Sequence, residues 1–377
     1  MQTNNHEEQL NNEGMLIKSK KTAKKRWLLV KIIAFILIAC LSIFLIFGIT
    51  KEFNGEMMDF NTMIKSINVK YLILTLLSIF LLLGIDVIIF STLIRSATGN
   101  IGLRESIKLA ILCKFYDNVT PFALGSQPMQ VYYLHQKGYN TGVATGIVVT
   151  KFVAQLFALD IVGGVLMVVG SSSLQLVQDS AMLYTLQIFG WLGYIIKFLI
   201  LAFIVMSFIF PKYITKVVNL YVGIGFKLKL IKNKQKELYR GYRLVNEYNS
   251  SLRMMIKKPI NFIIVIVASL LIPVITLAIP YFSVMTLGGV EIEPSFSLLI
   301  TVMSLNMYAT TSAALVPTPG NSGALEMTLS FAFASLFSLV SGWAILLSRF
   351  CTFYVFVAFG LIVLILDMVR SMKKGKK

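Results

Sequence analysis

Residues 260–282 read INFIIVIVASLLIPVITLAIPYF, a stretch that contains no charged side chain. About 20 consecutive apolar residues are enough to cross the hydrocarbon core of a bilayer as a helix. A segment inside the bilayer must satisfy its own backbone hydrogen bonds, so the run predicts a helix and not a strand. This stretch alone places the chain among the helical membrane proteins.

Further apolar runs of similar length lie on both sides of it. Hydrophobic residues make up 56% of the 377 residues and charged residues only 14%, whereas a soluble domain carries about 25% charged residues. The weak alternation of a transmembrane β-barrel is not visible. We therefore predict an all-α polytopic membrane protein with six or more transmembrane helices, the other runs being 28–49, 71–94, 143–170, 183–210 and 342–366.

The first run follows a basic stretch, as the apolar core of a signal peptide would. It is too long for that role, and no small-residue cleavage site follows it, so we expect a retained helix. The three cysteines, Cys40, Cys113 and Cys351, are far apart and show no pairing pattern. With only two histidines available as well, we expect no disulfide framework, no metal site and no cofactor.

The distribution of basic residues predicts the topology. Six Lys/Arg lie at 18–26, twelve lie at 211–259 against two Glu, and the chain ends in a basic tail at 371–377. Positive loops stay in the cytoplasm, so both termini and 211–259 are expected on that side of a bacterial cell membrane. The poorly basic or balanced segments 50–70, 171–182 and 283–296 are expected outside. We expect a basic tail (1–26) and one transmembrane domain (27–370) with halves at 28–170 and 183–366.

The basic segment 211–259 also contains tyrosines and phenylalanines between its cations. One interpretation is an interfacial helix that binds anionic lipid headgroups. The other is an ordinary positively charged loop. Nucleic acid is not an expected partner, because no binding motif or separate basic domain is present.

Two hairpins interrupt the apolar pattern. In the first, at 105–136, a short helix over 105–119 is followed by Pro121 and Gly125 and then by a second short helix. Neither half spans about 30 Å of hydrocarbon, so the chain is expected to turn back inside the protein. In the second, at 297–340, longer halves flank the turn, and a full double crossing stays open; its turn holds Pro317, Pro319, Gly320, Asn321, Gly323 and Glu326.

The two hairpins can be superimposed in sequence. Thr120-Pro121-x-x-x-Gly125 matches Thr318-Pro319-x-x-x-Gly323, and Lys151-Phe152 and Arg349-Phe350 follow the two glycines at equal spacing. The predicted topology brings the first hairpin in from the cytoplasm and the second from outside. Such a pattern is typical of an inverted repeat, which in transporters forms a binding site at the repeat interface. Chance coincidence of two Pro/Gly turns is the alternative.

Charged residues inside apolar runs are costly and therefore usually paired or functional. We predict the pairs Glu326–Arg349 and Lys151–Asp160; Lys197 is a third buried cation, while Asp86 is expected to hydrogen-bond locally. Structural ion pairing is one interpretation, and a polar cavity for a charged headgroup is the other. The candidate substrate-binding residues are Pro121, Gly125, Gln127, Gln130, Lys151, Asp160, Pro317, Pro319, Gly320, Asn321, Gly323, Glu326 and Arg349.

The segment Pro317-Thr-Pro-Gly-Asn-Ser-Gly-Ala-Leu-Glu326 resembles the P-x-P-G-x-x-G-x-x-E signature of the lysylphosphatidylglycerol synthase transmembrane family. The resemblance covers about 28–370. Members of this family commonly continue the first hairpin with Gly, an acid and Arg, whereas this chain has Gly125-Ser-Gln-Pro-Met-Gln130, and Lys151 replaces the usual Arg. Full-length synthases add a soluble domain that transfers lysine from lysyl-tRNA, and no region of this sequence resembles it.

Three functions follow from these features. The first is a flippase-like translocase for an anionic, aminoacylated or polyprenyl-linked lipid, with phospholipid as its partner and a link to cationic antimicrobial peptide resistance. The second is phosphatidylglycerol lysyltransferase activity, as the family name implies. The third is a scaffold that positions a separate synthase through the basic segment 211–259.

Overall fold

The computed structural model describes residues 58–374, except 100–101, 124, 173–179, 229–230, 232, 257, 288–292, 335 and 338. Within these residues the fold is helical, and no strand forms beyond one isolated bridge between Pro121 and Pro319. Five segments are long and apolar enough to span a membrane, at Val69–Ala97, Thr141–Ser172, Leu183–Met206, Pro259–Thr286 and Ser341–Arg370. They confirm five of the six predicted runs; the run at 28–49 lies outside the described residues.

The centre of the bundle is an antiparallel pair of long helices, α3 (Val69–Thr98) and α10 (Pro259–Thr286). Hydrogen bonds join them at both ends, from the Asn68 amide to the Thr286 carbonyl and from the Asn261 amide group to the Ser96 hydroxyl. A side-chain cap starts α3, and a proline in the first turn starts α10, where its missing N–H costs nothing. α3 packs on the helix Leu103–Val119 and α10 on the helix Phe296–Ala313, so the pair contacts both predicted hairpins.

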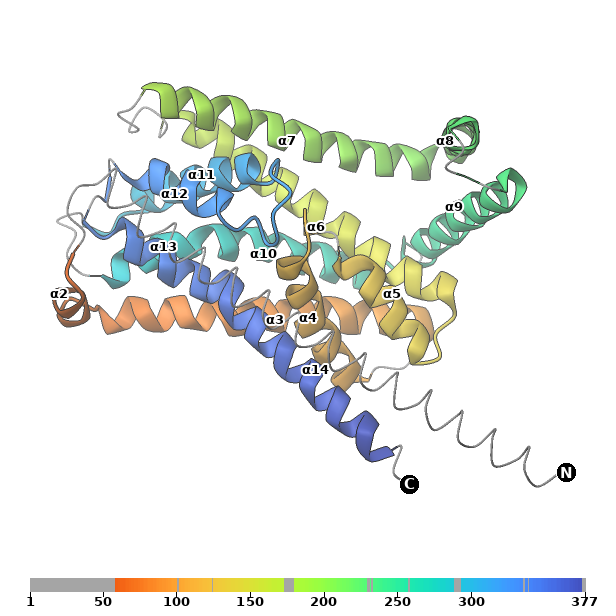
Figure 1. The fold of residues 1–377 in the computed structure, drawn as a ribbon, viewed down its shortest axis with the longest axis horizontal. Helices are drawn as coiled ribbons and strands as arrows, with labels where there is room; N and C mark the ends of the chain where they lie inside the picture. The colour runs from red at the N-terminus through yellow and green to blue at the C-terminus, as the bar shows by residue number, and fades with distance from the viewer. Residues whose placement is uncertain are drawn as a thin grey trace, which may run out of the picture.

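Each predicted hairpin is a pair of helices joined by a turn. The first consists of α4 (Leu103–Val119) and α5 (Ser126–Gln136), and the second of α11 (Phe296–Ala313) and α12 (Ala324–Ala334). Neither α4 nor α12 is among the candidate spans. The two turns come together near the middle of the bundle (Figure 1), and Phe122 of the first and Val316 beside the second are exposed.

A long helix follows each hairpin. After the first comes α6 (Thr141–Val169), capped by Asn140. After the second, α13 (Ser341–Arg349) passes through a π-helical turn, η2 (Phe350–Tyr354), into α14 (Val355–Lys374). The π turn begins directly after Arg349, and such turns are frequent at functional sites. Two buried apolar clusters hold these parts together, one around α3, α4, α5 and α6 and one around α10, α11, α12 and α13.

The remaining helices lie outside this core. Along one flank runs α7 (Ser180–Ile209), followed by α8 (Pro211–Lys227) and α9 (Lys234–Ile256), which returns to pack on α6 (Figure 1). The short α2 (Phe60–Lys65) precedes α3 at the opposite end of the bundle. The described C-terminal end and α8–α9 thus lie towards the same end, as the charge pattern predicts; which side of a membrane that end faces stays a prediction.

Candidate functional site

The two hairpin turns meet in the middle of the molecule. Pro121 of the first turn and Pro319 of the second form an antiparallel bridge, so the residues matched in sequence also lie opposite each other. A side chain at Gly320 would press against the Phe353 ring and come within 2.8 Å of the Asn118 carbonyl oxygen. Glycine at this position therefore lets the second turn approach α4 and η2 closely.

The two turns share an unusual backbone conformation. Phe122 and Ala123 of the first turn have φ of 56° and 54°, and Gly320 and Asn321, at the matching positions of the second, have 57° and 54°. Glycine and asparagine adopt this left-handed region readily, whereas phenylalanine and alanine do so at a cost of about 1–2 kcal/mol per residue. The first turn therefore keeps its shape with strained residues, and the second with suitable ones.

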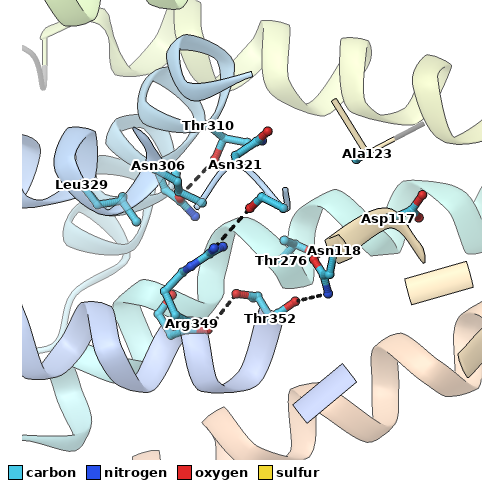
Figure 2. A pocket seen from close by; sticks show the side chains of 13 residues that line it. Asp117, Asn118, Ala123, Thr276, Asn306, Thr310, Asn321, Leu329, Arg349 and Thr352 are labelled. Atoms are coloured by element: carbon cyan, nitrogen blue, oxygen red, sulfur yellow. Dashed lines mark hydrogen bonds between the residues drawn. The ribbon is translucent and has the colours of Figure 1, made fainter. Parts of the chain in front are cut away.

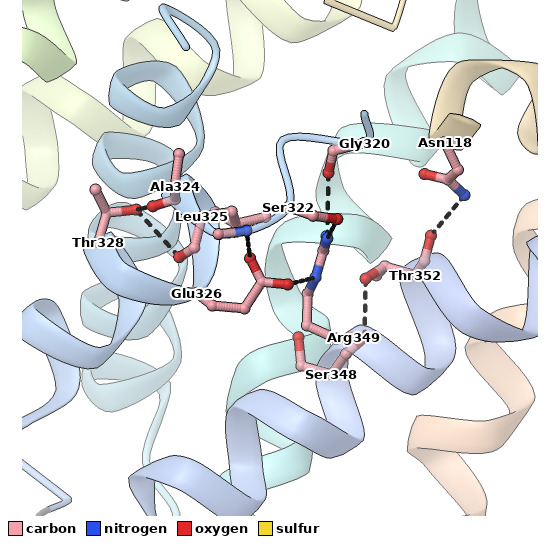
Figure 3. A network of polar contacts seen from close by, with 11 residues as sticks. Asn118, Gly320, Ser322, Ala324, Leu325, Glu326, Thr328, Ser348, Arg349 and Thr352 are labelled. Atoms are coloured by element: carbon pink, nitrogen blue, oxygen red, sulfur yellow. Dashed lines mark hydrogen bonds and ion pairs between the residues drawn. The ribbon is translucent and has the colours of Figure 1, made fainter. Parts of the chain in front are cut away.

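Beside the second turn lies a buried ion pair between Glu326 and Arg349. Arg349 Nε donates to Glu326 Oε1 at 2.8 Å, and the two residues are 0% and 4% exposed. The second amino group, Nη2, donates to the Gly320 carbonyl (3.2 Å) and the Ser322 hydroxyl (3.1 Å), which ties the turn to the pair (Figure 3). The predicted Glu326–Arg349 pair is confirmed. A buried charge at either position needs such a partner, since isolation would cost several kcal/mol.

The first amides of α12 are already engaged within the protein. The Gly323 amide donates to Glu326 Oε2 at 2.8 Å, and the amides of Leu325 and Met327 donate to carbonyls of the preceding turn. At the corresponding point of the first hairpin the Gly125 amide donates to the Thr120 hydroxyl at 2.9 Å. Amides at both helix starts thus have protein partners, and Glu326 takes the place that an anionic ligand would occupy at the start of α12.

A cavity of about 170 Å³ opens where the two turns meet. Its wall combines amide and hydroxyl side chains with the guanidinium of Arg349 and the carboxyl group of Asp117, and these groups come from α4, α10, α11, α13, η2 and the second turn (Figure 2). Two internal hydrogen bonds hold parts of the wall, from Thr310 to Asn306 and from Asn118 to the Thr352 carbonyl. The lining residues are Asp117, Asn118, Ala123, Thr276, Asn306, Thr310, Gly320, Asn321, Leu325, Leu329, Ser348, Arg349 and Thr352.

Arg349 has hydrogen-bonding capacity left towards this cavity. Its Nε and Nη2 are used by Glu326, Gly320 and Ser322, while no described residue accepts a hydrogen bond from Nη1. The ring of Phe353 lies 4.7 Å from the guanidinium carbon and supports its plane. A guanidinium that is held in position and retains free N–H groups suits an oxyanion such as phosphate.

A second buried charge cluster lies on the side of the first hairpin. Asp86 of α3, which is fully buried, forms ion pairs with Lys151 of α6 at 3.1 Å and with Lys114 of α4 at 3.2 Å. Gln155 connects Asp86 to Lys151, since its Nε2 donates to Asp86 and its Oε1 accepts from Lys151. The thiol of Cys113 also accepts from Lys151, at 3.4 Å. This arrangement, here named the Asp86 cluster, links three helices through one carboxylate.

The predicted pair of Lys151 with Asp160 is wrong. The two residues lie about two and a half turns apart on α6, so their side chains point to opposite faces of that helix. Lys151 instead contacts Asp86, and neither carboxylate oxygen of Asp160 has a hydrogen-bond partner among the described residues. Lys197 of α7 attracts Asp160 electrostatically. Asp86 was expected to bond locally; it is the centre of the cluster instead.

An ion pair closes the open end of the first hairpin. Lys137, which caps the end of α5, lies 3.1 Å from Glu105 at the start of α4. The hydrogen bond from Lys137 holds the pKa of Glu105 below its usual value. Lys108 and Lys137 also lie over the ring of Tyr133. Since these groups are partly exposed, the pair contributes at most about 1 kcal/mol.

The predicted site residues fall into three groups in the structure. Gly320, Asn321 and Arg349 line the cavity, and Glu326 supports Arg349 from behind. Gln130 contacts the Asp86 cluster, since its Nε2 donates to the Cys113 thiol. Away from the cavity wall are Asp160, Pro317 and Gln127, the last with a buried carbonyl oxygen that has no partner among the described residues.

Several lining residues could not have been selected from the sequence. Asn118, Thr276, Asn306 and Thr310 are uncharged and come from three helices, so no spacing rule groups all of them. Asp86 and Lys114 did carry a signal, because a charge in or beside an apolar run needs a partner at membrane depth. The choice of partner required the packing of α3 against α4 and α6.

The fold and the site define a helical multi-pass membrane protein with a polar cavity where two hairpin turns meet. Its family follows from comparison with known proteins: residues 31–360 match the model of the lysylphosphatidylglycerol synthase TM region, and the chain belongs to this family. No curated protein and no solved structure matches the chain. The family connects the protein to membrane lipids.

Proposed function

We propose that this protein is a lipid translocase, which moves an anionic, aminoacylated or polyprenyl-linked lipid between the leaflets of the cell membrane. The observation that carries the proposal is Arg349, which Glu326 holds in place and which lines the cavity between the two turns. A lipid phosphate at this point would accept charge-assisted hydrogen bonds from the guanidinium. These bonds would replace the hydrogen bonds that water makes to the phosphate at the membrane surface. The amide and hydroxyl wall would replace further headgroup hydration.

Matched features of the two halves support an alternating mechanism. Pro121 pairs with Pro319, and the following two residues of each turn adopt the same left-handed conformation. An inverted repeat whose broken segments meet at a site is the arrangement that secondary transporters use for alternating access. In this proposal the turns separate on one side at a time, and the headgroup binds at the point where they meet.

The proposal is tested by lipid movement in proteoliposomes. Fluorescent phosphatidylglycerol, lysylphosphatidylglycerol and polyprenyl phosphate would be reconstituted separately, and the label in the outer leaflet bleached chemically over time. We expect Arg349→Gln and the cavity variant Asn306→Leu to slow movement of the accepted lipid by about tenfold or more, as loss of a charge-assisted bond predicts. Arg240→Gln is the matched control, because Arg240 pairs with Glu237 on exposed α9.

Each outcome has a defined meaning. Monodisperse elution and an unchanged melting temperature of Asn306→Leu would separate loss of transport from loss of fold. Equal rates for the wild type, Arg349→Gln and Asn306→Leu would contradict the translocase. Formation of lysyl-lipid by the purified protein from charged lysyl-tRNA would favour the transferase that the family name describes.

A further inference from the structure

The helix α8 lies across the direction of the spanning helices. Figure 1 shows α7 from the side and α8 nearly end-on, at the end of the bundle where α7 finishes. The change of direction occurs at Phe210 and Pro211, where a non-helical residue is followed by proline in the first position of α8. Because α7 is a candidate span, a helix that crosses its axis runs along the plane of the membrane.

One face of α8 is apolar and exposed. The exposed fractions of its large apolar side chains run from 43% at Val217 to 72% at Tyr221. Apart from Phe226, which lies on the opposite side, their positions recur at intervals of three and four residues, so they form a single stripe along the helix. This apolar stripe consists of Val217, Leu220, Tyr221, Ile224 and the C-cap residue Leu228.

The neighbouring face of α8 is already packed against α9 and the segment between them. Val222 is buried, and a side chain at Gly241 of α9 would meet Val218 at 2.5 Å. Asn219 accepts a hydrogen bond from the hydroxyl of Tyr242 at 2.5 Å. The helix is therefore fixed in its rotation, and the apolar stripe points away from the protein parts that the structure describes.

Cations border the stripe. Lys216 and Lys227 lie along one edge of it, and both are exposed. The whole segment 211–259 carries twelve Lys/Arg against two Glu, so its surroundings are strongly positive. An apolar stripe with flanking lysines matches the boundary of a bilayer with anionic headgroups, where apolar side chains enter the acyl region and the ammonium groups stay at the phosphates.

We propose that α8 is an interfacial anchor, which inserts the apolar stripe into the acyl–headgroup boundary and binds anionic phospholipid through Lys216 and Lys227. This inference is independent of translocation, because it concerns a surface outside the cavity. It also decides between the two interpretations of the basic segment: an ordinary loop would have no reason to align its apolar residues on one exposed face. The anchor fixes the end of α7 at the membrane surface.

The test uses tryptophan fluorescence of the full chain in nanodiscs whose lipids carry brominated acyl chains. Tyr221→Trp places the probe on the stripe, and Phe226→Trp is the matched control, an exposed aromatic position about half a turn around the same helix. Emission is taken as the difference from the wild type, which has three tryptophans. We expect bromine to quench the probe at position 221 about twofold more than the probe at position 226, and aqueous iodide to quench the probe at position 226 more.

A second experiment tests whether Lys216 and Lys227 bind anionic headgroups. Discs that contain phosphatidylglycerol should increase bromine quenching at position 221 relative to discs of phosphatidylcholine alone, and Lys216→Gln with Lys227→Gln should remove that increase. Equal bromine quenching at 221 and 226 would overturn the anchor. So would protection of position 221 from both quenchers, with elution as a dimer, since a second copy would then cover the stripe.

Discussion

The two hairpins are followed at equal spacing by a buried cation, but each cation is neutralised in a different way. Arg349 on α13 finds its partner in the hairpin that directly precedes it, because Glu326 lies in the first turn of α12. The position of the first hairpin that matches Glu326 is Pro128, which has no charge to offer. Lys151 therefore reaches across to Asp86 on α3. The two halves therefore place a buried cation at matching positions, but the carboxylate that neutralises it comes from a different element in each half.

The two solutions have different consequences for the rest of the molecule. The Glu326–Arg349 pair organises one turn and leaves part of Arg349 facing the cavity. The Asp86 cluster instead joins α3, α4 and α6 and contributes no lysine to the cavity wall. We interpret the second hairpin, with Arg349 beside it, as the side that provides the cation of the cavity, while the first contributes Asp117, Asn118 and Ala123 to the same wall.

The largest effect is expected at the centre of the Asp86 cluster. Asp86→Asn would leave Lys114 and Lys151 buried without their shared carboxylate, at a cost of about 4–5 kcal/mol. Thermal unfolding in detergent, followed with a thiol-reactive dye that reports exposure of buried Cys113 and Cys351, measures it. The control is Asp59→Asn, because Asp59 is exposed and asparagine caps α2 equally well. Equal melting temperatures for both variants would refute the cluster's structural role.

The second effect concerns the pair in the other hairpin. Glu326→Gln or Arg349→Gln strands one buried charge and is expected to cost about 3 kcal/mol. The double variant leaves no buried charge without a partner. It should therefore lose less stability than the sum of the losses of the two single variants. A double-mutant cycle on unfolding in detergent measures this coupling. Additive effects would mean that the two side chains do not interact in the membrane protein.

At the two turns we expect smaller effects on stability, with opposite signs in the first and the second turn. Gly320→Ala adds a methyl group at positive φ against Phe353 and the Asn118 carbonyl, and should destabilise by about 2 kcal/mol. Ala123→Gly relieves the same backbone strain in the first turn and should stabilise by about 0.5 kcal/mol. The melting temperatures of the two variants should shift in opposite directions. A downward shift for both would show that the first turn is not strained.

The smallest effect is expected at Asp160. Because neither carboxylate oxygen has a described hydrogen-bond partner, Asp160→Asn should change the unfolding free energy by less than about 1 kcal/mol. A loss near that of Asp86→Asn, measured in the same assay, would show instead that the attraction between Asp160 and Lys197 stabilises the fold.

Local rules found the hairpins and the pair beside the second one. Proline and glycine between two short apolar segments predict a turn. Glu326 and Arg349 are charged residues within apolar runs of the same half of the chain, which predicts that they pair. The same rules failed for Lys151, because sequence proximity favoured Asp160. Helical geometry puts that residue on the opposite face. The true partner, Asp86, lies 65 residues earlier in the chain, on another helix.

By itself the sequence determined the class of protein, because a bilayer accepts only segments that hide their backbone, and hydropathy reports this directly. It also determined the family, through the residues of the second turn. Only the tertiary structure decided what surrounds those residues: the meeting of Pro121 with Pro319, the polar wall of the cavity and the choice of Asp86. These depend on which helix faces pack together, and contacts between distant segments leave no periodic trace in one sequence.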